Sequence, residues 1–336
     1  MENGVLDPEK TIMMNEIREE PLALSKTFKA LTINFTEIIE TINNSDIVYI
    51  TGSGTSYHAS INLQITLLRH GIKAVAVMAS ELEYYLPVNR TSRITIILFS
   101  QSGESKDILK SLELSKARGY NTIGITNIKD STLAKSVDIP IITMANEEKS
   151  VAATKSHIVQ ILISIMMDAK LSNNENNEDI KKIQENVSNI ISNRDKIKKI
   201  AAGISDRIVL LGDGYLYPSA MEGALKFKET GNLITESYPP REYLHGPIQA
   251  LNRDTTVIIL NYHDNIDKGV INKISRITKK VISIGNRNSN DLTIADTTDV
   301  VAPLLFLIPL QIMANYKAVN LHLNPDSPSN LTKIVE

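Results

Sequence analysis

Hydroxyl side chains gather in a short stretch between a predicted strand and a predicted helix. Residues 94–98 form a β-branched run typical of a buried parallel strand, and residues 106–118 have apolar residues at helical spacing. The sequence FSQSGES at residues 99–105 joins them and brings hydroxyls and free backbone N–H groups to the positive end of a helix dipole, where an anion is stabilised. An ordinary helix N-cap explains the same residues equally well.

A second stretch of small hydroxyl residues, TGSGTS at residues 51–56, follows the predicted strand DIVYI. Its Gly-x-Gly turn does not predict a dinucleotide site, because Tyr57 stands where that motif has its third glycine, and no GK[ST] sequence of a P-loop is present. In a doubly wound sheet such loops meet at the carboxyl ends of the strands, so residues 55–56 and 100–105 could clasp one phosphate. The absence of basic residues from both loops suits a phosphate monoester of a small neutral molecule, such as a sugar.

Candidate reactive groups lie in the second half of the chain. Glu222, Lys226 and Glu229 share one face of a predicted helix, at spacings of four and three residues. On spacing alone, a solvent-facing Glu–Lys ladder, worth roughly a few tenths of a kcal/mol per pair, is the simpler explanation. Among six histidines, His245 lies in the loop-like sequence EYLHGP and is the best candidate for general acid–base chemistry. No pair of histidines has the spacing of metal ligands, so neither a metal nor another cofactor is predicted.

The elements that must position these residues alternate between strand and helix. The first series has predicted strands at residues 46–50, 74–78, 94–99, 121–126 and 137–143, and a nearly all-apolar helix at 154–169. The second has predicted strands at residues 207–211, 256–261 and 280–285, and a closing helix at 303–321. Alternation with short links predicts an α/β fold, in which a parallel sheet is covered by helices on both faces.

The chain is predicted to contain two copies of this architecture, because residues 207–214 (RIVLLGDG) echo residues 47–54 (IVYITGSG). Between the two series the composition changes to Asn, Glu and Lys, which is typical of a connecting helix or a solvated linker. We therefore expect a polar tail at residues 1–20, a first doubly wound domain at 21–170, a helical linker at 171–200 and a second domain at 201–336. An amphipathic helix is expected to begin at Pro21.

Composition limits the classes of partner. The 336 residues carry a net charge of −2, which gives no electrostatic case for nucleic acid or for an anionic membrane. There is no cysteine, so disulfides, thiolate metal sites and cysteine nucleophiles are excluded. The first ten residues lack the pattern of a signal peptide. The apolar residues 300–314 are too few to span a bilayer and are predicted to form a buried core helix. These observations predict a soluble cytoplasmic protein.

Six motifs, in order and with compatible spacing, resemble the sugar isomerase (SIS) family. They are SGTSY at residues 53–57, SQSGES at 100–105, VAATK at 151–155, MEGALKFKE at 221–229, EYLHGP at 242–247 and NLTKIVE at 330–336. Within that family they are most similar to the isomerase half of glucosamine-6-phosphate synthases. The resemblance extends from about residue 16 to the end of the chain and implies two tandem SIS domains, each with a flavodoxin-like sheet.

The resemblance also implies a substrate-binding site. Phosphate contacts are expected from the two hydroxyl stretches: Thr55, Ser56, Ser100, Gln101, Ser102 and Ser105. Further substrate contacts are expected at Gly54, Val151 and Glu222. Ser105 replaces the threonine usual in the family and keeps its hydroxyl.

Catalytic roles follow from the same resemblance. Glu229 corresponds to the base that moves a proton between C1 and C2 of the sugar, and Lys226 to its neighbour on the helix. His245 corresponds to the histidine that opens the sugar ring from the partner subunit, which implies a homodimer. Lys333 corresponds to a lysine that forms a Schiff base with a ketose.

The sequence departs from the synthases in four respects. Ser53 stands where they have cysteine, Ala153 where they have serine, and Arg241 where they have glycine. The sequence also lacks their glutaminase domain and its cysteine, so transfer of ammonia from glutamine is not expected of this chain. The prediction is a glucosamine-6-phosphate deaminase. The alternatives are a fructosamine-phosphate deglycase, another sugar-phosphate isomerase, and a non-catalytic phosphosugar sensor.

Overall fold

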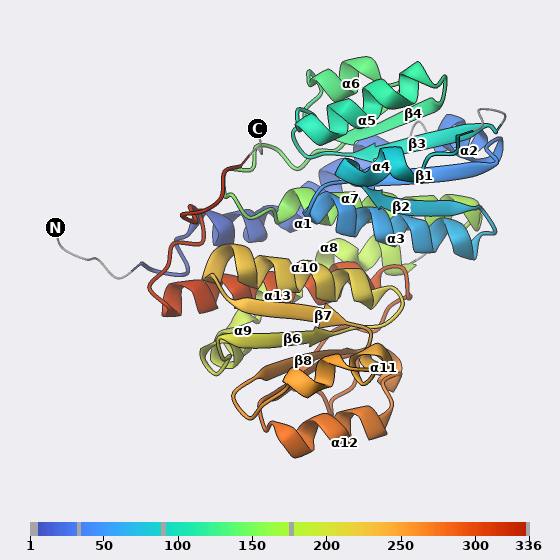
Figure 1. Ribbon diagram of the computed structural model, residues 1–336. Coiled ribbons are helices and arrows are strands. Elements are labelled where there is room, and N and C mark those ends of the chain that lie inside the picture. The colour runs from blue at the N-terminus through green and yellow to red at the C-terminus, as the bar shows by residue number, and fades with distance from the viewer. Residues whose placement is uncertain (1–5, 32–34, 89–91, 175–177, 334–336) are drawn as a thin grey trace. The chain divides into compact units, whose positions relative to one another are not determined.

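The computed structural model describes residues 6–31, 35–88, 92–174 and 178–333. By internal contacts the chain divides into two compact units, each with its own sheet (Figure 1). The first-sheet unit comprises Glu20–Glu148, Lys155–Lys181 and Lys333–Glu336. The second-sheet unit comprises Met1–Glu19, Lys149–Thr154 and Lys182–Thr332. Helix α1 (Ile12–Leu31) and helix α8 (Glu178–Ser192) each carry the chain from one unit to the other.

The first sheet is entirely parallel, in the order β2-β1-β3-β4-β5. Its strands are β1 (Ile47–Gly52), β2 (Ala74–Met78), β3 (Ile94–Phe99), β4 (Asn121–Thr126) and β5 (Ile139–Ile142). Its helices are α2 (Phe35–Asn43), α3 (Thr55–Arg69), η1 (Ala79–Glu81), α4 (Leu82–Tyr85), α5 (Lys106–Ala117), α6 (Thr132–Ser136) and α7 (Lys155–Leu171). Helices α4, α5 and α6 pack on one face of the sheet, and α3 and α7 lie on the other (Figure 1).

The second sheet repeats this winding in the order β10-β9-β8-β6-β7, and it too is parallel. Its strands are β6 (Arg207–Leu211), β7 (Ile234–Tyr238), β8 (Thr256–Asn261), β9 (Val281–Gly285) and β10 (Leu292–Thr293). The unit's other elements are α9 (Arg194–Ala202), α10 (Leu216–Gly231), α11 (Pro240–Tyr243), η2 (Pro247–Ala250), η3 (Tyr262–Asp264), α12 (Lys268–Ile277) and α13 (Ala302–Asn320). Both orders reduce to 2-1-3-4-5, which confirms the predicted doubly wound fold and its duplication.

The echoed Gly-x-Gly turns have the same geometry in both sheets. A Cβ on Gly52 would lie 2.6 Å from the backbone of Ser56, and one on Gly212 would lie 2.5 Å from the backbone of Leu216. The second glycine of each turn has a positive φ, 53° in Gly54 and 50° in Gly214. Each turn therefore needs its first glycine for space and its second for backbone conformation.

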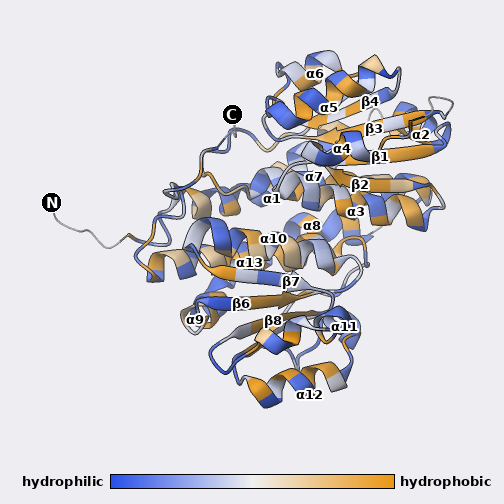
Figure 2. Cartoon of the chain, in the orientation of Figure 1, coloured by the Kyte–Doolittle hydropathy of each residue, from blue (hydrophilic) through white to orange (hydrophobic). Residues whose placement is uncertain are grey.

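The core of each sheet follows from continuous apolar runs in the strands. In Figure 2, β1 and β8 are largely in the apolar colours, as expected for strands buried on both faces. In the described part of the chain, helix α13 is long enough and apolar enough to cross a membrane. Its most apolar stretch is, however, entirely buried inside the protein. The prediction of a buried core helix at this position is confirmed.

The start of the first helix was predicted wrongly. Helix α1 begins at Ile12, and Pro21, the predicted first residue, lies inside it. Met13, Met14 and Ile17 are fully buried, so apolar packing stabilises this first part of the helix. Part of the cap at Ile12 is the carboxylate of Asp326, more than 300 residues away in the sequence. The local sequence therefore does not reveal where the helix begins.

Candidate active site

The two hydroxyl loops leave neighbouring strands of the first sheet. One loop joins β1 to α3 and the other joins β3 to α5, and β1 pairs directly with β3. In the order β2-β1-β3-β4-β5 this is the point at which the winding reverses, and ligands of open α/β sheets bind outside the carboxyl ends of the strands there. The adjacency of the loops, predicted from the sequence, is therefore present in the fold.

The hydroxyls of the second loop accept hydrogen bonds from the loop's own backbone. Gly103 N–H donates to Ser100 Oγ at 3.0 Å, and Glu104 N–H donates to Ser102 Oγ at 3.2 Å. Each contact uses a lone pair of the oxygen, so the hydroxyl hydrogen can still be donated to an oxyanion. Ser105 is the N-cap residue of α5 but makes no side-chain capping bond. The ordinary N-cap explanation therefore does not account for the Ser105 hydroxyl.

Glycines give both loops their shape. Gly103 has a φ of 69°, and a Cβ there would lie 2.3 Å from Ser131 Oγ, so both conformation and space require glycine. Gly54 is the N-cap residue of α3, and the space in front of its Cα is open within 4 Å. Ser56 is buried, and its Oγ accepts a hydrogen bond from Gln160 Nε2 of α7 at 3.1 Å. Gln160, which the sequence did not single out, thus fixes the rotamer of a predicted phosphate contact.

The three charged residues of α10 form a buried cluster. Lys226 Nζ lies 3.1 Å from Glu222 Oε1 and 2.5 Å from Glu229 Oε2, and the side chains of Lys226 and Glu222 have no exposed surface. The solvent-facing ladder favoured by spacing alone is therefore wrong. Burial by itself lowers the pKa of Lys226, but the nearby carboxylates of Glu222 and Glu229 outweigh it and raise the pKa above its ordinary value. Lys226 is a fixed buried cation.

A glycine explains how the cluster becomes buried. Helix α10 packs against α13 and β6, and a Cβ on Gly223 would lie 2.6 Å from Leu310 Cδ1 and 2.8 Å from Leu210 Cδ2. Without a side chain there, the helix comes close enough to the sheet and to α13 to cover Lys226. The side chain of Glu229 stays 20% exposed, so this carboxylate is anchored on one side and accessible on the other.

Glu229 lines a cavity of about 460 Å³ within the second-sheet unit. The cavity lies between the C-terminal part of α10 with its C-cap residue Asn232 and the segment of residues 322–331 that follows α13. His322 is also on its wall, with a positive φ of 60° at the C-terminus of α13. His322 has no motif around it and was missed in the sequence. A volume of this size accommodates a small polar molecule.

His245 and Lys333 are placed differently. His245 follows α11, is exposed, and does not line the Glu229 cavity. Lys333 Nζ lies 3.1 Å from Glu148 Oε2 in the first-sheet unit. The Glu148 carboxylate is buried and also accepts hydrogen bonds from the side chain and backbone of Ser156. Glu148 thus orients the lysine, a role that no sequence motif suggested.

Comparison with known proteins identifies the family. The profile of the SIS domain matches residues 41–168 and 204–320, one segment in each sheet. The chain belongs to the SIS family.

Two relatives of this SIS chain are larger proteins. The chain is 32% identical to a glutamine–fructose-6-phosphate aminotransferase of Fusobacterium nucleatum and 33% identical to one of Sulfurisphaera tokodaii. Each alignment covers 96% of this chain but only 58% and 56% of those relatives. The chain therefore spans just over half the length of the curated relatives that it matches.

Solved SIS structures match over nearly the whole of both chains. The C-terminal domain of a glucosamine-fructose-6-phosphate aminotransferase from Francisella tularensis superposes with a TM-score of 0.83 at 27% identity, covering 95% of this chain and 98% of that one. A glucosamine-6-phosphate deaminase from Thermotoga maritima superposes with a TM-score of 0.81 at 25% identity, covering 97% and 99%. A tagatose-6-phosphate ketose/aldose isomerase from Escherichia coli, with a TM-score of 0.85 at 20% identity, shares the fold.

The predicted site residues of this SIS protein divide between the two units. The hydroxyl loops and Lys333 belong to the first-sheet unit, whereas Val151, the α10 cluster and His245 belong to the second-sheet unit. Within the units, the fold brings together the two hydroxyl loops in one and Glu222, Lys226 and Glu229 in the other. Among the described residues, no group of three or more His, Asp or Glu side chains is placed to hold a metal ion.

Proposed function

We propose that this SIS protein is a glucosamine-6-phosphate deaminase, which converts the amino sugar phosphate and water to fructose 6-phosphate and ammonia. The observation that carries the proposal is the Glu229 carboxylate, which is anchored by a buried lysine and faces a cavity of suitable size. Similarity over nearly the full chain to a deaminase and to aminotransferase isomerase domains supports the substrate class.

Each proposed step has a residue of this chain to perform it. His245 transfers a proton between the ring oxygen and O1, which opens the pyranose to the aldehyde. Glu229 then removes the proton from C2 while O1 takes up a proton, which gives an enolamine, and returns the proton to C1 while the nitrogen gives one up. The product is the ketose imine, in which C2 is doubly bonded to nitrogen. Water adds to C2 and ammonia leaves, so that fructose 6-phosphate is formed and all atoms balance.

In this proposal the hydroxyl loops bind the phosphate of the substrate. Hydroxyl and backbone N–H donors at the start of α5 are suited to a phosphate dianion. The phosphate is remote from C1 and C2, so its binding holds the substrate in position but the phosphate takes no part in proton transfer. Lys333, oriented by Glu148, acts as a cation or as an amine near the ketose.

The test is direct. The protein is incubated with glucosamine 6-phosphate, and both ammonia and fructose 6-phosphate are measured over time. Stoichiometric release of the two supports the proposal, and no release contradicts it. A panel of phosphorylated fructosamines and other aldose and ketose phosphates then separates a deglycase or a simple isomerase from a deaminase. Tight binding of phosphosugars without turnover of any of them would indicate a sensor.

Removing a loop hydroxyl should weaken substrate binding. In Ser102→Ala the KM for glucosamine 6-phosphate should rise roughly tenfold or more, because a hydrogen bond to a charged group is lost. kcat should change much less, since the phosphate contact is the same in the ground state and the transition state. Ser80→Ala, which removes an exposed hydroxyl outside both loops, is the matched control. An unchanged KM in Ser102→Ala would count against the phosphate assignment.

A homodimer in which His245 acts on the partner's site predicts complementation between inactive variants. His245→Asn and Glu229→Gln should each be inactive alone. After mixing, denaturation and refolding together, heterodimers contain one site with both native residues, so part of the wild-type activity should return. Absence of recovery in a mixture that forms heterodimers would show that His245 acts within its own subunit or not at all.

A further inference from the structure

The segment of residues 322–331, which lines the Glu229 cavity, contains an aspartate that hydrogen-bonds the start of α1. After α13 the chain has no further helix or strand in its described part, and Asn324 and residues 327–331 line the cavity. Asp326 lies between these lining residues and points its carboxylate away to the start of α1. Ile12 N–H donates to Asp326 Oδ2 and Met13 N–H donates to Asp326 Oδ1, both at 2.7 Å. The backbone carbonyl of Asp326 accepts a further hydrogen bond from Val151 N–H at 3.4 Å.

The start of α1 depends on this carboxylate. The first turn of the helix contains no acidic residue of its own, and a carboxylate near this positive end of the dipole is stabilising. Thr11 Oγ1 accepts the N–H of Met14 at 3.1 Å and is the local cap. The two remaining N–H groups, those of Ile12 and Met13, are the ones that Asp326 takes. A negative charge donated from the C-terminal segment therefore completes the cap.

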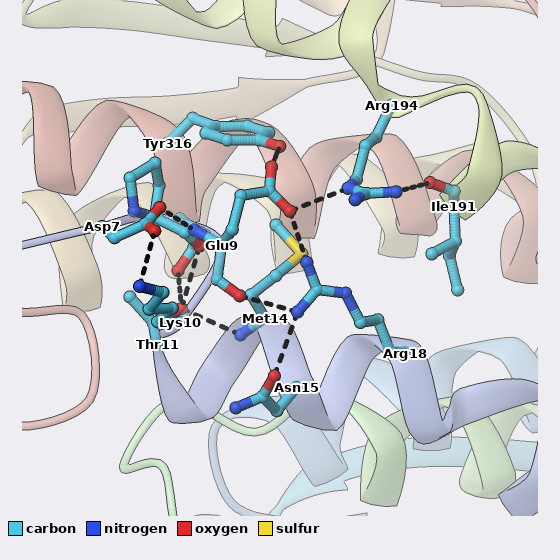
Figure 3. A network of polar contacts seen from close by, with 12 residues as sticks. Asp7, Glu9, Lys10, Thr11, Met14, Asn15, Arg18, Ile191, Arg194 and Tyr316 are labelled. Atoms are coloured by element: carbon cyan, nitrogen blue, oxygen red, sulfur yellow. Dashed lines mark hydrogen bonds and ion pairs between the residues drawn. The ribbon is translucent and has the colours of Figure 1, made fainter.

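The start of α1, to which Asp326 binds, is itself held by side-chain contacts. Glu9, just before α1, accepts bonds from Arg18, Arg194 and the hydroxyl of Tyr316 on α13 (Figure 3). Thr11 Oγ1 also donates to Asn315 Oδ1, again on α13, at 2.7 Å. The start of α1 is thus tied to the same helix from which the C-terminal segment departs. The two hydrogen bonds of the Asp326 carboxylate therefore hold the C-terminal segment against a well-anchored part of the protein.

We infer that Asp326 is a positioning residue, which holds the C-terminal segment as the wall of the cavity beside Glu229. The inference rests on the proposed function for its effect on turnover, but the fastening itself is independent of the reaction. Asp326 does not itself line the cavity, but its backbone N–H donates to Oδ1 of Asn324 on the cavity wall at 3.0 Å, and its carboxylate bonds the start of α1 rather than a proposed proton-transfer group. Its effect passes through the backbone of residues 327–331, which it aligns against the C-terminal part of α10.

The experiment compares Asp326→Asn with Thr11→Ala. Both substitutions weaken the capping of the same turn of α1, but only the first weakens hydrogen bonds between α1 and the C-terminal segment. In Asp326→Asn, amide hydrogen exchange of residues 321–331 should accelerate, and the KM for glucosamine 6-phosphate should rise by roughly ten- to a hundredfold. In Thr11→Ala, exchange of residues 321–331 and the KM should stay near wild type, although the melting temperature falls. Asp326→Glu, which keeps the charge, should restore part of the KM.

Three results would overturn the inference. They are unchanged exchange of residues 321–331 in Asp326→Asn, faster exchange with an unchanged KM, and equal effects of Asp326→Asn and Thr11→Ala on the KM. If the wild-type protein turns over no sugar phosphate, the exchange measurements alone decide the role of Asp326. The failed assay then counts against the proposed reaction and not against the fastening.

Discussion

Glutamine in place of Glu229 should lower kcat for ammonia release from glucosamine 6-phosphate by roughly 10²–10⁴-fold, the usual contribution of a general base. The amide has nearly the same shape as the carboxylate but cannot accept the C2 proton. The KM should change little, because the hydroxyl loops and the other residues that line the cavity are unchanged. Steady-state assays with coupled detection of ammonia and fructose 6-phosphate measure both constants.

Two controls make the Glu229→Gln result specific. The variant should keep its melting temperature within a few degrees of wild type, because Lys226 retains its contact with Glu222 at 3.1 Å. Glu185→Gln, which removes an exposed carboxylate on α8, should keep full activity. Exchange of the C2 hydrogen with deuterium from solvent should also cease in Glu229→Gln. Full activity of this variant, or loss of activity only through unfolding, would remove Glu229 from the proposed mechanism.

The substitution with the largest expected effect on stability is Lys226→Met. It leaves the carboxylate of Glu222, which has no exposed surface, without the ammonium that lies beside it. Removing one partner of a buried ion pair costs about 3–5 kcal/mol of unfolding free energy, a large share of the 5–15 kcal/mol that stabilises a typical domain. Urea denaturation followed by circular dichroism measures the loss.

The double variant Glu222→Gln/Lys226→Met isolates the cause of that loss. With the buried carboxylate neutralised, the double variant should be more stable than Lys226→Met alone, so the two changes should not be additive. Acidification should also narrow the difference between Lys226→Met and wild type, because Glu222 can then take up a proton. If Lys226→Met loses less than about 1 kcal/mol, or the double variant is the least stable of the set, the buried cation is not what holds this cluster together.

Strands were the most predictable part of the fold. The bounds of β2, β3, β4 and β8 agree with the sequence prediction, because a parallel strand covered on both faces needs an uninterrupted apolar run. Strand β7 was missed because it lies at the edge of its sheet and is only partly buried, so ITESY carries polar residues. Strand β10, with two residues, is too short for any pattern.

The residues of the candidate site were predictable in type but not in environment. Spacing placed Glu222, Lys226 and Glu229 on one helix face, yet it could not tell a solvated face from a buried one. That difference depends on Gly223 and on helix α13, which packs against α10 from about 80 residues farther along the chain. The role of Glu148 could not be predicted for a related reason, because its partner Lys333 is 185 residues away in the sequence.

Local sequence patterns were enough to predict the doubly wound α/β fold, its duplication, the two hydroxyl loops and the candidate base on α10. These features can be predicted locally, because strand burial, turn glycines and helical spacing each depend on a stretch of a few residues. Three features became visible only in the folded chain: Lys226 is a buried cation, Glu229 faces a cavity, and α1 begins at Ile12. The last depends on Asp326, 314 residues from Ile12, whose carboxylate completes the cap. Contacts between distant segments set burial and electrostatics, and these are properties of the folded chain rather than of any stretch of it.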